Sequence, residues 1–267
     1  MKTVKNGHKR HIRLDAVLLI IGVVCLSIFA GISYYNAMEE KRSRETVQQL
    51  RSMRDVGIAP RVDSSQTDTE KQDAITTSYE RLFEANADMI GWLNIPGTQI
   101  DYPVMQTLED EEYYLRRNFY KEKDKNGCLL MDTDSDIHMA GANLIIHGHN
   151  MKSGDMFGTL QDYQDQEYGM EHKKMYLYTR DGKREYELIA AFFSKVYLQT
   201  DQVFKYYQYF GGEDPDAFDS FYSNIKKLSL YDTGVEAEYG DGFLTLSTCA
   251  YQTKNGRFVV VAKRIEE

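Results

Sequence analysis

The sequence has few of the residues that define several common classes of protein. It holds only 3 cysteines in 267 residues, which excludes the disulfide framework of a small secreted domain. Its 4 prolines are too few for a collagenous or low-complexity chain. Acidic residues outnumber basic ones by 41 to 32, so the chain lacks the basic surface of a nucleic-acid-binding protein. What remains is a globular composition, 42% hydrophobic and 12% aromatic.

One long uncharged segment interrupts this polar chain. Residues 16–35 carry no charged side chain, and a helix of that length, at about 1.5 Å per residue, spans the roughly 30 Å hydrocarbon core of a membrane. Five Lys and Arg lie within residues 1–13, and positively charged flanks stay in the cytoplasm. We therefore expect a cytoplasmic tail at 1–15, a single-pass signal-anchor in the cell membrane, and an extracellular remainder. A cleaved signal peptide is the alternative, since Ala30 and Gly31 would suit a peptidase.

The chain beyond the anchor divides into a polar stretch and a compact domain. Residues 36–73 are rich in charge and then in Ser, Thr, Gln and Asp, which predicts a helical stalk followed by a flexible spacer. Apolar residues then recur at helical spacing from Ile75 to Ile90, which predicts an amphipathic helix that opens the domain. Residues 74–267 are numerous enough to enclose one sizeable core.

Short strands dominate the pattern of this domain. The segment 174–197 is typical of a hairpin that turns at Asp181-Gly182, and segment 241–265 is typical of a second strand pair. Between them, Asp214–Leu228 predicts a helix, because Asp214 can cap it and Pro215 fits its first turn. These elements predict a mainly antiparallel barrel with added helices.

Cys249 is the best candidate for a nucleophile. Cys25 lies in the apolar segment, and Cys128 starts an apolar run, as a buried small hydrophobe would. Cys249 instead ends the alternating strand FLTLSTC, which places a thiol at the end of a sheet, next to a polar connection. If this strand pairs with the next in antiparallel fashion, Arg257 faces Cys249. A guanidinium there can hold a developing oxyanion or a substrate carbonyl, although an isolated Arg would be an ordinary strand-edge charge.

The base for such a thiol should be one of the six histidines. His147 and His149 follow an apolar run and precede a turn, so both lie at a strand end, where a structural role is also open to them. Two imidazoles spaced in this way can bind zinc, but no third ligand accompanies them at metal spacing. We therefore expect neither a metal nor a cofactor. The order His before Cys differs from that of papain-like enzymes, and the chain has no caspase signature.

Taken together, these residues resemble the sortases, and specifically class B, the membrane-anchored cysteine transpeptidases of Gram-positive bacteria. The resemblance covers roughly residues 74–267. It rests on TLSTC at 245–249 with Arg257 eight residues later, GHNM at 148–151, MIGWLNIPGTQIDYPVMQ at 89–106 and YYLRRNF at 113–119.

The resemblance implies both a fold and a reaction. The fold would be mainly β (α+β), a closed eight-stranded sortase-type β-barrel with peripheral helices. The enzyme would cleave a C-terminal sorting signal of exported proteins after Thr, and would transfer the acyl group through a Cys thioester to an amine of the cell-wall peptidoglycan. The implied catalytic residues are Cys249 as nucleophile, His149 as acid and base, and Arg257 as the oxyanion- or substrate-orienting residue. The implied substrate-binding residues are Ser247, Thr248 and His147.

Several alternatives remain open. Class B members often have an aromatic residue two positions before the catalytic His, whereas this chain has His147, a second imidazole that could partly replace His149. The same site could serve a membrane-anchored cysteine endopeptidase that releases surface proteins. An interpretation from another class is a surface scaffold in which Cys249 is only a strand residue. The expected partners are exported proteins with a sorting signal, a peptidoglycan precursor or cell-wall amine, and the membrane through residues 16–35, but no nucleic acid.

Overall fold

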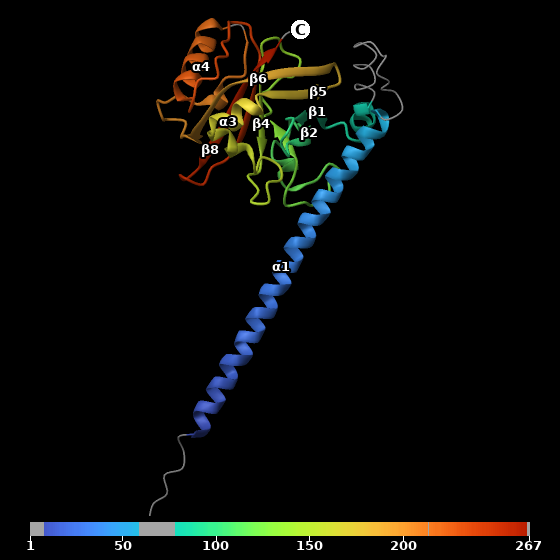
Figure 1. Cartoon of the computed structure of the whole chain (residues 1–267), viewed down its shortest axis with the longest axis vertical. Helices are drawn as coiled ribbons and strands as arrows, with labels where there is room; N and C mark the ends of the chain where they lie inside the picture. Colours follow the sequence, from blue (N-terminus) through green and yellow to red (C-terminus); the bar gives the residue numbers. More distant parts are fainter. Residues whose placement is uncertain (1–7, 59–77, 213, 266–267) are drawn as a thin grey trace, which may run out of the picture. The chain divides into compact units, whose positions relative to one another are not determined.

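The computed structural model describes residues 8–58, 78–212 and 214–265 (Figure 1). The chain divides into two compact units, Met1–Glu45 and Thr46–Glu267. Part of the expected basic tail, the expected spacer beyond residue 58 and Ile75 lie outside the described residues.

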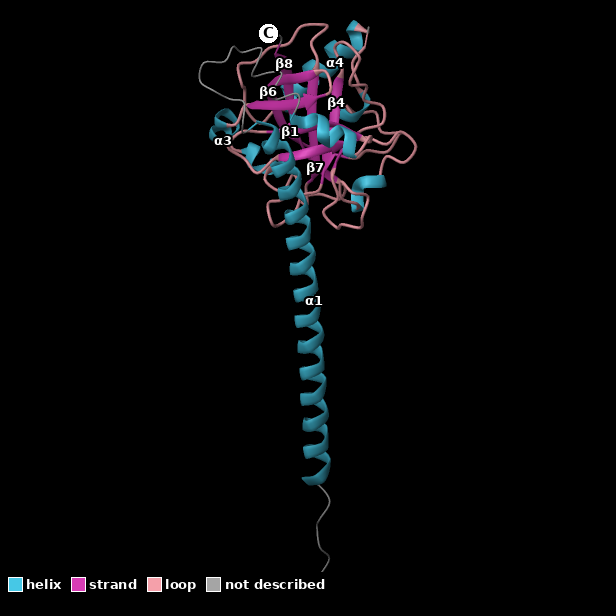
Figure 2. Ribbon diagram, turned by 90° about the vertical axis from the view of Figure 1, so that its right-hand side faces the viewer, coloured by secondary structure: helices cyan, strands magenta, loops and turns pink. Residues whose placement is uncertain are grey.

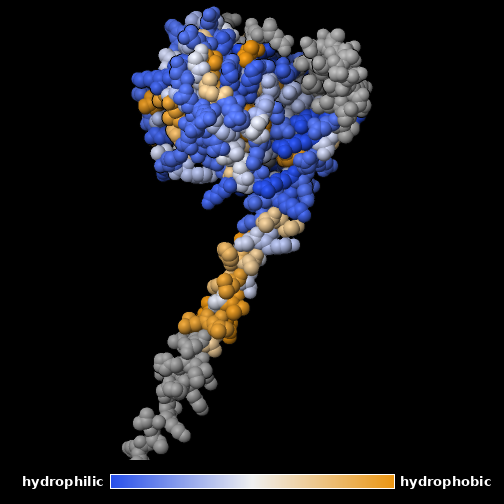
Figure 3. Space-filling model, in the orientation of Figure 1, coloured by the Kyte–Doolittle hydropathy of each residue, from blue (hydrophilic) through white to orange (hydrophobic). Residues whose placement is uncertain are grey.

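Helix α1 (His8–Ile58) begins in the first unit and ends in the second. Among the described residues it is the one helix long and apolar enough to cross a membrane, over Ala16–Asp55. Its large apolar side chains from Val17 to Ile32 are exposed, and Figure 3 shows them gathered around the helix. The predicted apolar segment at 16–35 is therefore helical, with a surface that suits lipid rather than water.

Eight strands of the second unit close into a barrel in the order β1-β2-β3-β4-β7-β8-β6-β5. Two of the pairs, β2 with β3 and β4 with β7, are parallel, and the other six are antiparallel. Figure 2 shows the strands gathered in one body with helices and loops around them. The strands are β1 (Met89–Asn94), β2 (Asp101–Met105), β3 (Leu129–Met131), β4 (Asn143–Gly148), β5 (Lys174–Thr179), β6 (Gly182–Lys195), β7 (Phe243–Cys249) and β8 (Gly256–Ile265). The predicted closed eight-stranded fold is confirmed.

Short helices surround the barrel. They are the 3-10 helices η1 (Tyr113–Arg116), η2 (Leu160–Gln164) and η3 (Tyr206–Gln208), the α-helices α3 (Gln166–Glu171) and α4 (Pro215–Leu228), and a helical segment at residues 78–85. The start of α4 is the predicted one, because the Asp214 side chain accepts a hydrogen bond from the backbone N–H of Asp216 and Pro215 occupies the first turn.

Two local predictions had different outcomes. The hairpin that turns at Asp181-Gly182 is confirmed, since β5 and β6 pair antiparallel on either side of it. The predicted opening helix is wrong at its end, because Ile90 lies in β1 and the helical segment stops at residue 85. Asn86 ends it, since its side-chain oxygen accepts the backbone N–H of Asp88 while its amide donates to the carbonyl of Phe119.

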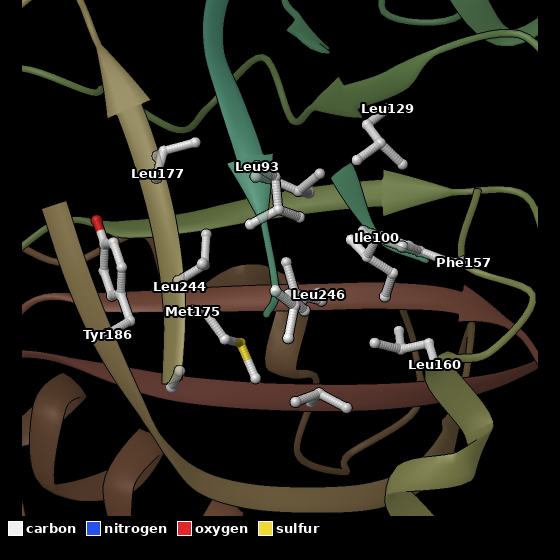
Figure 4. Packing of buried hydrophobic residues seen from close by; sticks show 14 of the residues in the cluster. Leu93, Ile100, Leu129, Phe157, Leu160, Met175, Leu177, Tyr186, Leu244 and Leu246 are labelled. Atoms are coloured by element: carbon white, nitrogen blue, oxygen red, sulfur yellow. The ribbon is translucent and has the colours of Figure 1, made fainter. Parts of the chain in front are cut away.

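The barrel encloses the main hydrophobic core. Alternate residues of each strand point inward, for example Leu144 and Ile146 on β4 and Leu244 and Leu246 on β7. Figure 4 shows such side chains from different strands pointing toward one another. Complete burial of a Leu side chain stabilises the fold by roughly 2 kcal/mol, so the enclosed residues hold the barrel shut.

A second cluster covers the outer face of the barrel beneath α4. Phe218, Phe221 and Ile225 are buried on one face of this helix and pack with Phe243 and Val261. The buried face of this helix is thus the one that covers the sheet.

The end of α1 also packs on the barrel within the second unit. Leu50 is buried with Trp92, and the guanidinium of Arg54 lies over the Trp92 ring. Arg54 Nη1 is 2.7 Å from Asp101 Oδ1, and Arg51 Nη2 donates to the Asp101 carbonyl at 2.9 Å. Paired, half-buried charges and a buried Leu therefore hold residues 46–55 against β1 and β2.

Candidate active site

The catalytic residues predicted from the sequence lie together on the outer face of the barrel, beside His147 and Ser247. Because Leu144 and Ile146 point into the core, the alternation of β4 turns His147 outward. His149 follows on the same side two residues later, directly after the strand. The Gly148 between them faces inward, where a Cβ would lie 2.5 Å from the Phe157 ring, so only glycine fits there.

Cys249 ends β7 on the same outer face. In the antiparallel register of β7 and β8, its partner is Arg257, which confirms the pairing predicted from the sequence. The parallel register of β4 and β7 pairs His147 with Ser247 and Gly148 with Thr248, and the next residues in this register are His149 and Cys249. Three neighbouring strand ends thus present His149, Cys249 and Arg257 as one row, with the thiol in the middle.

This row borders a cleft of about 360 Å³. This volume lies within the range of ligand-binding clefts in proteins, about 300–1,000 Å³. Its lining consists of Glu111, Glu112, Leu115, Cys128, Leu130, His147, Gly148, His149, Ser247, Thr248, Cys249 and Arg257.

The imidazole of His149 is oriented by the main chain of η1. Its Nε2 lies 2.9 Å from the carbonyl oxygen of Leu115. A carbonyl oxygen can only accept, so Nε2 carries the proton in this contact. Nδ1 is therefore the ring nitrogen left for proton exchange.

Two hydrogen bonds fasten the strand ends that carry the pair. The Thr248 hydroxyl donates to the carbonyl of Gly148 at 2.8 Å, and the Asn150 amide donates to the carbonyl of Cys249 at 2.7 Å. Both bonds join the segment that carries His149 to the segment that carries the thiol. They restrict how far the two side chains can move apart.

Ser247 is tied to a tyrosine that the sequence analysis did not single out. Its Oγ lies 2.7 Å from the hydroxyl of Tyr206 in η3, and both residues are 1% exposed. Burial raises the pKa of Tyr206 to about 12, although the hydrogen bond with Ser247 and the positive charge of Arg257 act in the opposite direction. Tyr206 is thus hydrogen-bonded to the residue two positions before Cys249 in β7. Arg257 itself is half-buried, and its Nη1 donates to the carbonyl of Gly256 at 3.1 Å.

Two acidic residues, Glu111 and Asp132, lie beside His147. His147 Nε2 lies 3.4 Å from Asp132 Oδ2, and Glu111 completes a group whose ligand-type atoms all lie within 4.8 Å of one another. Partial burial, and then the negative charge of Asp132, raise the pKa of the Glu111 carboxyl. These are the residues that could hold a metal ion.

Cys128 is buried, as predicted for a small hydrophobe, and it forms part of the cleft wall. Burial raises the pKa of its thiol strongly, which makes it a poor nucleophile. The contacts not predicted from the sequence are those of Leu115, Asn150, Tyr206, Glu111 and Asp132. They come from loops and short helices with no periodic pattern, so the signals were the motifs GHNM around Asn150 and YYLRRNF around Leu115.

The model of the sortase domain matches residues 93–265 of this chain. The chain belongs to the sortase family. Sortase B of Staphylococcus aureus is 26% identical over 263 residues, which is 97% of this chain and 98% of that protein. Sortase B of Listeria monocytogenes is 28% identical over 250 residues, which is 93% of this chain and 94% of that protein.

Solved structures agree with this assignment. A Staphylococcus aureus sortase B–substrate complex superposes with a TM-score of 0.71 at 26% identity, covering 86% of this sortase and 99% of that chain. Sortase B from Bacillus anthracis in complex with AAEK1 gives a TM-score of 0.68 at 28% identity, with the same coverage. The recognition of a class B sortase from the sequence is confirmed, and the chain is a cysteine transpeptidase of cell-wall sorting.

Proposed function

We propose that Cys249, His149 and Arg257 carry out the transpeptidase reaction of this sortase. The observation that supports this assignment is the row of these three residues on adjacent strand ends, with Cys249 in register with Arg257. The row borders the cleft, so a peptide in the cleft can reach the thiol.

In the first half-reaction, the Cys249 thiolate attacks the carbonyl carbon of the Thr at which the sorting signal is cleaved. A C–S bond forms, the C–N bond of the scissile peptide breaks, and His149 delivers a proton to the departing amine. The products are a thioester on Cys249 and a released C-terminal peptide with a free amine.

In the second half-reaction, an amine of the cell wall attacks the thioester. His149, now neutral, takes the proton from the attacking nitrogen while the C–S bond breaks and the thiolate leaves. Because Nε2 donates to Leu115, this exchange is assigned to Nδ1. One imidazole therefore serves both steps.

Arg257 acts as a positive donor and not as a base, because a guanidinium stays protonated. Opposite Cys249, it can donate hydrogen bonds to the carbonyl oxygen as negative charge develops on it. Such donors stabilise the transition state more than the ground state, which is what accelerates the reaction.

We assign Ser247, Thr248 and His147 to the wall of the substrate groove, with different parts in it. His147 is the most exposed of the three and can touch a bound peptide. Ser247 and Thr248 are almost fully buried, and their hydroxyls are already engaged with Tyr206 and Gly148. They contribute shape and position to the groove more than hydrogen bonds to substrate.

We further propose how the chain is placed in the cell. Residues 16–35 would cross the membrane once, with 1–15 in the cytoplasm, 36–73 as the link and 74–267 as the extracellular catalytic domain. The supports are the exposed apolar side chains of α1 and the basic residues that precede residue 16. The membrane would hold the enzyme where exported proteins meet peptidoglycan precursors.

The test uses the full-length chain in detergent with a library of fluorogenic peptides that carry a Pro-x-Thr core, with and without a diamine. Mass spectrometry should find cleavage after Thr and, when the amine is present, the amide-ligated product. The Cys249→Ala variant should give neither product. Release of the free acid alone, whatever the amine concentration, would indicate an endopeptidase. No thiol-dependent reaction on any peptide would reject the roles assigned above.

A further inference from the structure

Three side chains that are far apart in sequence converge at the side of the cleft, and two of them, Glu111 and His147, line it. Glu111 lies in the loop before η1, Asp132 directly follows β3, and His147 is in β4. Each offers one ligand atom, and these atoms all lie within 4.8 Å of one another. A shared ion is one reason for two carboxylates and an imidazole to meet at this spacing.

The separation of His147 and Asp132 points to a ligand between them. Their Nε2 and Oδ2 atoms are 3.4 Å apart, which is longer than a good N–H···O hydrogen bond of about 2.9 Å. Two ligands at about 2.0–2.1 Å from one tetrahedral zinc ion are separated by about 3.4 Å. The pair therefore has the spacing of two corners of a metal site.

The neighbouring residues hold Asp132 in this orientation. The backbone N–H of Asp134 donates to Asp132 Oδ1 at 3.0 Å, which leaves Oδ2 directed at His147. The Gln106 amide donates to the carbonyls of Asp132 and Ser135, at 2.8 and 2.9 Å, and so fixes the turn itself. Outer contacts of this kind orient the ligands of metal sites.

Glu111 is the exposed member of the group. A carboxylate oxygen of its side chain lies within 4.8 Å of the ligand atoms of Asp132 and His147, so a rotation of this side chain can bring it onto the same ion.

We propose that Glu111, Asp132 and His147 form a binding site for a divalent transition metal such as Zn²⁺. One imidazole and two carboxylates suit zinc better than magnesium or calcium, which prefer oxygen ligands alone. The fourth position of the ion would face the cleft, because Glu111 and His147 line it.

Occupation of the site would affect the enzyme through this cleft. His147 is the cross-strand neighbour of Ser247, two residues before Cys249, so an ion on His147 would stand against the groove wall. We expect it to obstruct the sorting signal and to inhibit turnover. Only this effect on turnover depends on the function proposed above, whereas the binding of the ion does not.

The binding test uses Co²⁺ as a spectroscopic substitute for Zn²⁺ on the full-length chain in detergent, in a Cys249→Ala background that removes the reactive thiol. We expect the visible absorption of four-coordinate Co²⁺, without the near-ultraviolet band of a cobalt–thiolate bond, and its displacement by Zn²⁺. Asp132→Asn and His147→Gln should each weaken binding at least about tenfold, and Glu111→Gln should weaken it to a smaller degree.

A matched control is His138→Gln, since His138 is also paired with an aspartate but lies on the exposed surface. It should leave Co²⁺ affinity unchanged. Thermal melting of every variant establishes that lost binding is not lost folding. The proposal is overturned if Asp132→Asn and His147→Gln, both folded, bind Co²⁺ as tightly as their parent.

The second arm measures turnover of the enzyme with Cys249 intact. Zn²⁺ should inhibit it at the concentrations that displace Co²⁺, and His147→Gln should raise the inhibitory concentration at least about tenfold. Inhibition that is equal in both proteins would place the ion on the Cys249 thiolate and would contradict the proposed effect on turnover. Failure of all peptide turnover, with the Co²⁺ spectrum intact, would instead reject the proposed function and leave the metal site standing.

Discussion

The outer face of β7 and β8 is hydrophobic at one end and carries the proposed catalytic residues at the other. At the start of β7, Phe243 points outward and is covered by Phe218 and Phe221 of α4. At its end, Cys249 has the same outward orientation but borders the open cleft. The strand and its pairing are continuous between the two ends. What distinguishes a core from an active site on this sheet is therefore whether a helix covers it.

The largest expected effect comes from removing the thiol at the open end. Cys249→Ala should reduce turnover by at least about 10⁴-fold, since removal of a covalent nucleophile leaves only binding and electrostatic stabilisation. Peptide cleavage followed by mass spectrometry measures it. The melting temperature should stay within about 2 °C, because the side chain lies at the edge of the cleft. Cys128→Ala is the matched control, and it should lose stability by about 1 kcal/mol while keeping turnover within about tenfold.

The covered end should respond in the opposite way. Phe221→Ala should lower the free energy of unfolding by about 3–5 kcal/mol, because it empties the centre of the aromatic cluster under α4. Urea denaturation measures it. Ser223→Ala, at an exposed position of the same helix, should change it by less than about 0.5 kcal/mol. A large loss of turnover per folded Phe221→Ala molecule would mean that the two ends are not separable.

The two ends of β8 can be compared through Arg257, beside Cys249, and Arg264, near the opposite end. Arg257→Ala should reduce kcat/KM by about 10²–10³-fold, which is typical of losing one oxyanion donor. Arg257→Lys should restore only part of this activity, because a single ammonium cannot reproduce the planar donors of the guanidinium. Arg264→Ala, near the other end of β8, should leave kcat/KM within about twofold. An Arg257→Ala enzyme of unchanged kcat/KM would contradict the assignment.

The smallest effect is expected at the hydrogen bond between Tyr206 and Ser247, which lies between the covered and the open end of β7. Tyr206 packs against Phe192 and shares a hydrogen bond with Ser247, so Tyr206→Phe should cost about 1 kcal/mol of stability. A double-mutant cycle with Ser247→Ala should return a coupling energy of similar size. Additive single effects would mean that the hydrogen bond contributes nothing.

The hydroxyl of Tyr206 also makes the stability of the fold depend on pH. Its folded-state pKa of about 12 exceeds the unfolded value of about 10, so the folded state holds the proton more firmly. Its contribution to stability is complete below pH 10 and is lost as the pH rises from about 10 to 12. The free energy of unfolding, measured by urea denaturation between about pH 10 and 12, should fall more steeply with pH in the native chain than in Tyr206→Phe. Identical slopes would show that Tyr206 titrates normally.

The sequence predicted the parts of this molecule that depend on local pattern. The facing of Cys249 and Arg257 follows from one strand pair with a short connection, and the cap of α4 follows from Asp214 and Pro215. The opening helix was predicted to reach Ile90, because Ile90 continues the helical spacing. Asn86 ends it earlier through a contact with the distant Phe119, which local spacing cannot show.

The contacts that complete the site could not be predicted in the same way. The carbonyl of Leu115, the hydroxyl of Tyr206 and the carboxylate of Asp132 contact His149, Ser247 and His147 from short helices and a loop. These partners are 34, 41 and 15 residues apart in the chain. Only the closure of the barrel brings them to the same place. For the same reason, the sequence did not show that Glu111 and Asp132 lie beside His147.

The closed barrel also limits how this enzyme can recognise a peptide. Among the described strands none has a free edge, because β1 pairs with β5 as well as with β2 and completes the circle. An extended peptide therefore cannot join as an additional strand, which is a common mode of peptide capture elsewhere. It must be held through side chains and loops on the outer surface. Selectivity for one signal over another can then change by replacement of loop residues while the barrel is left intact.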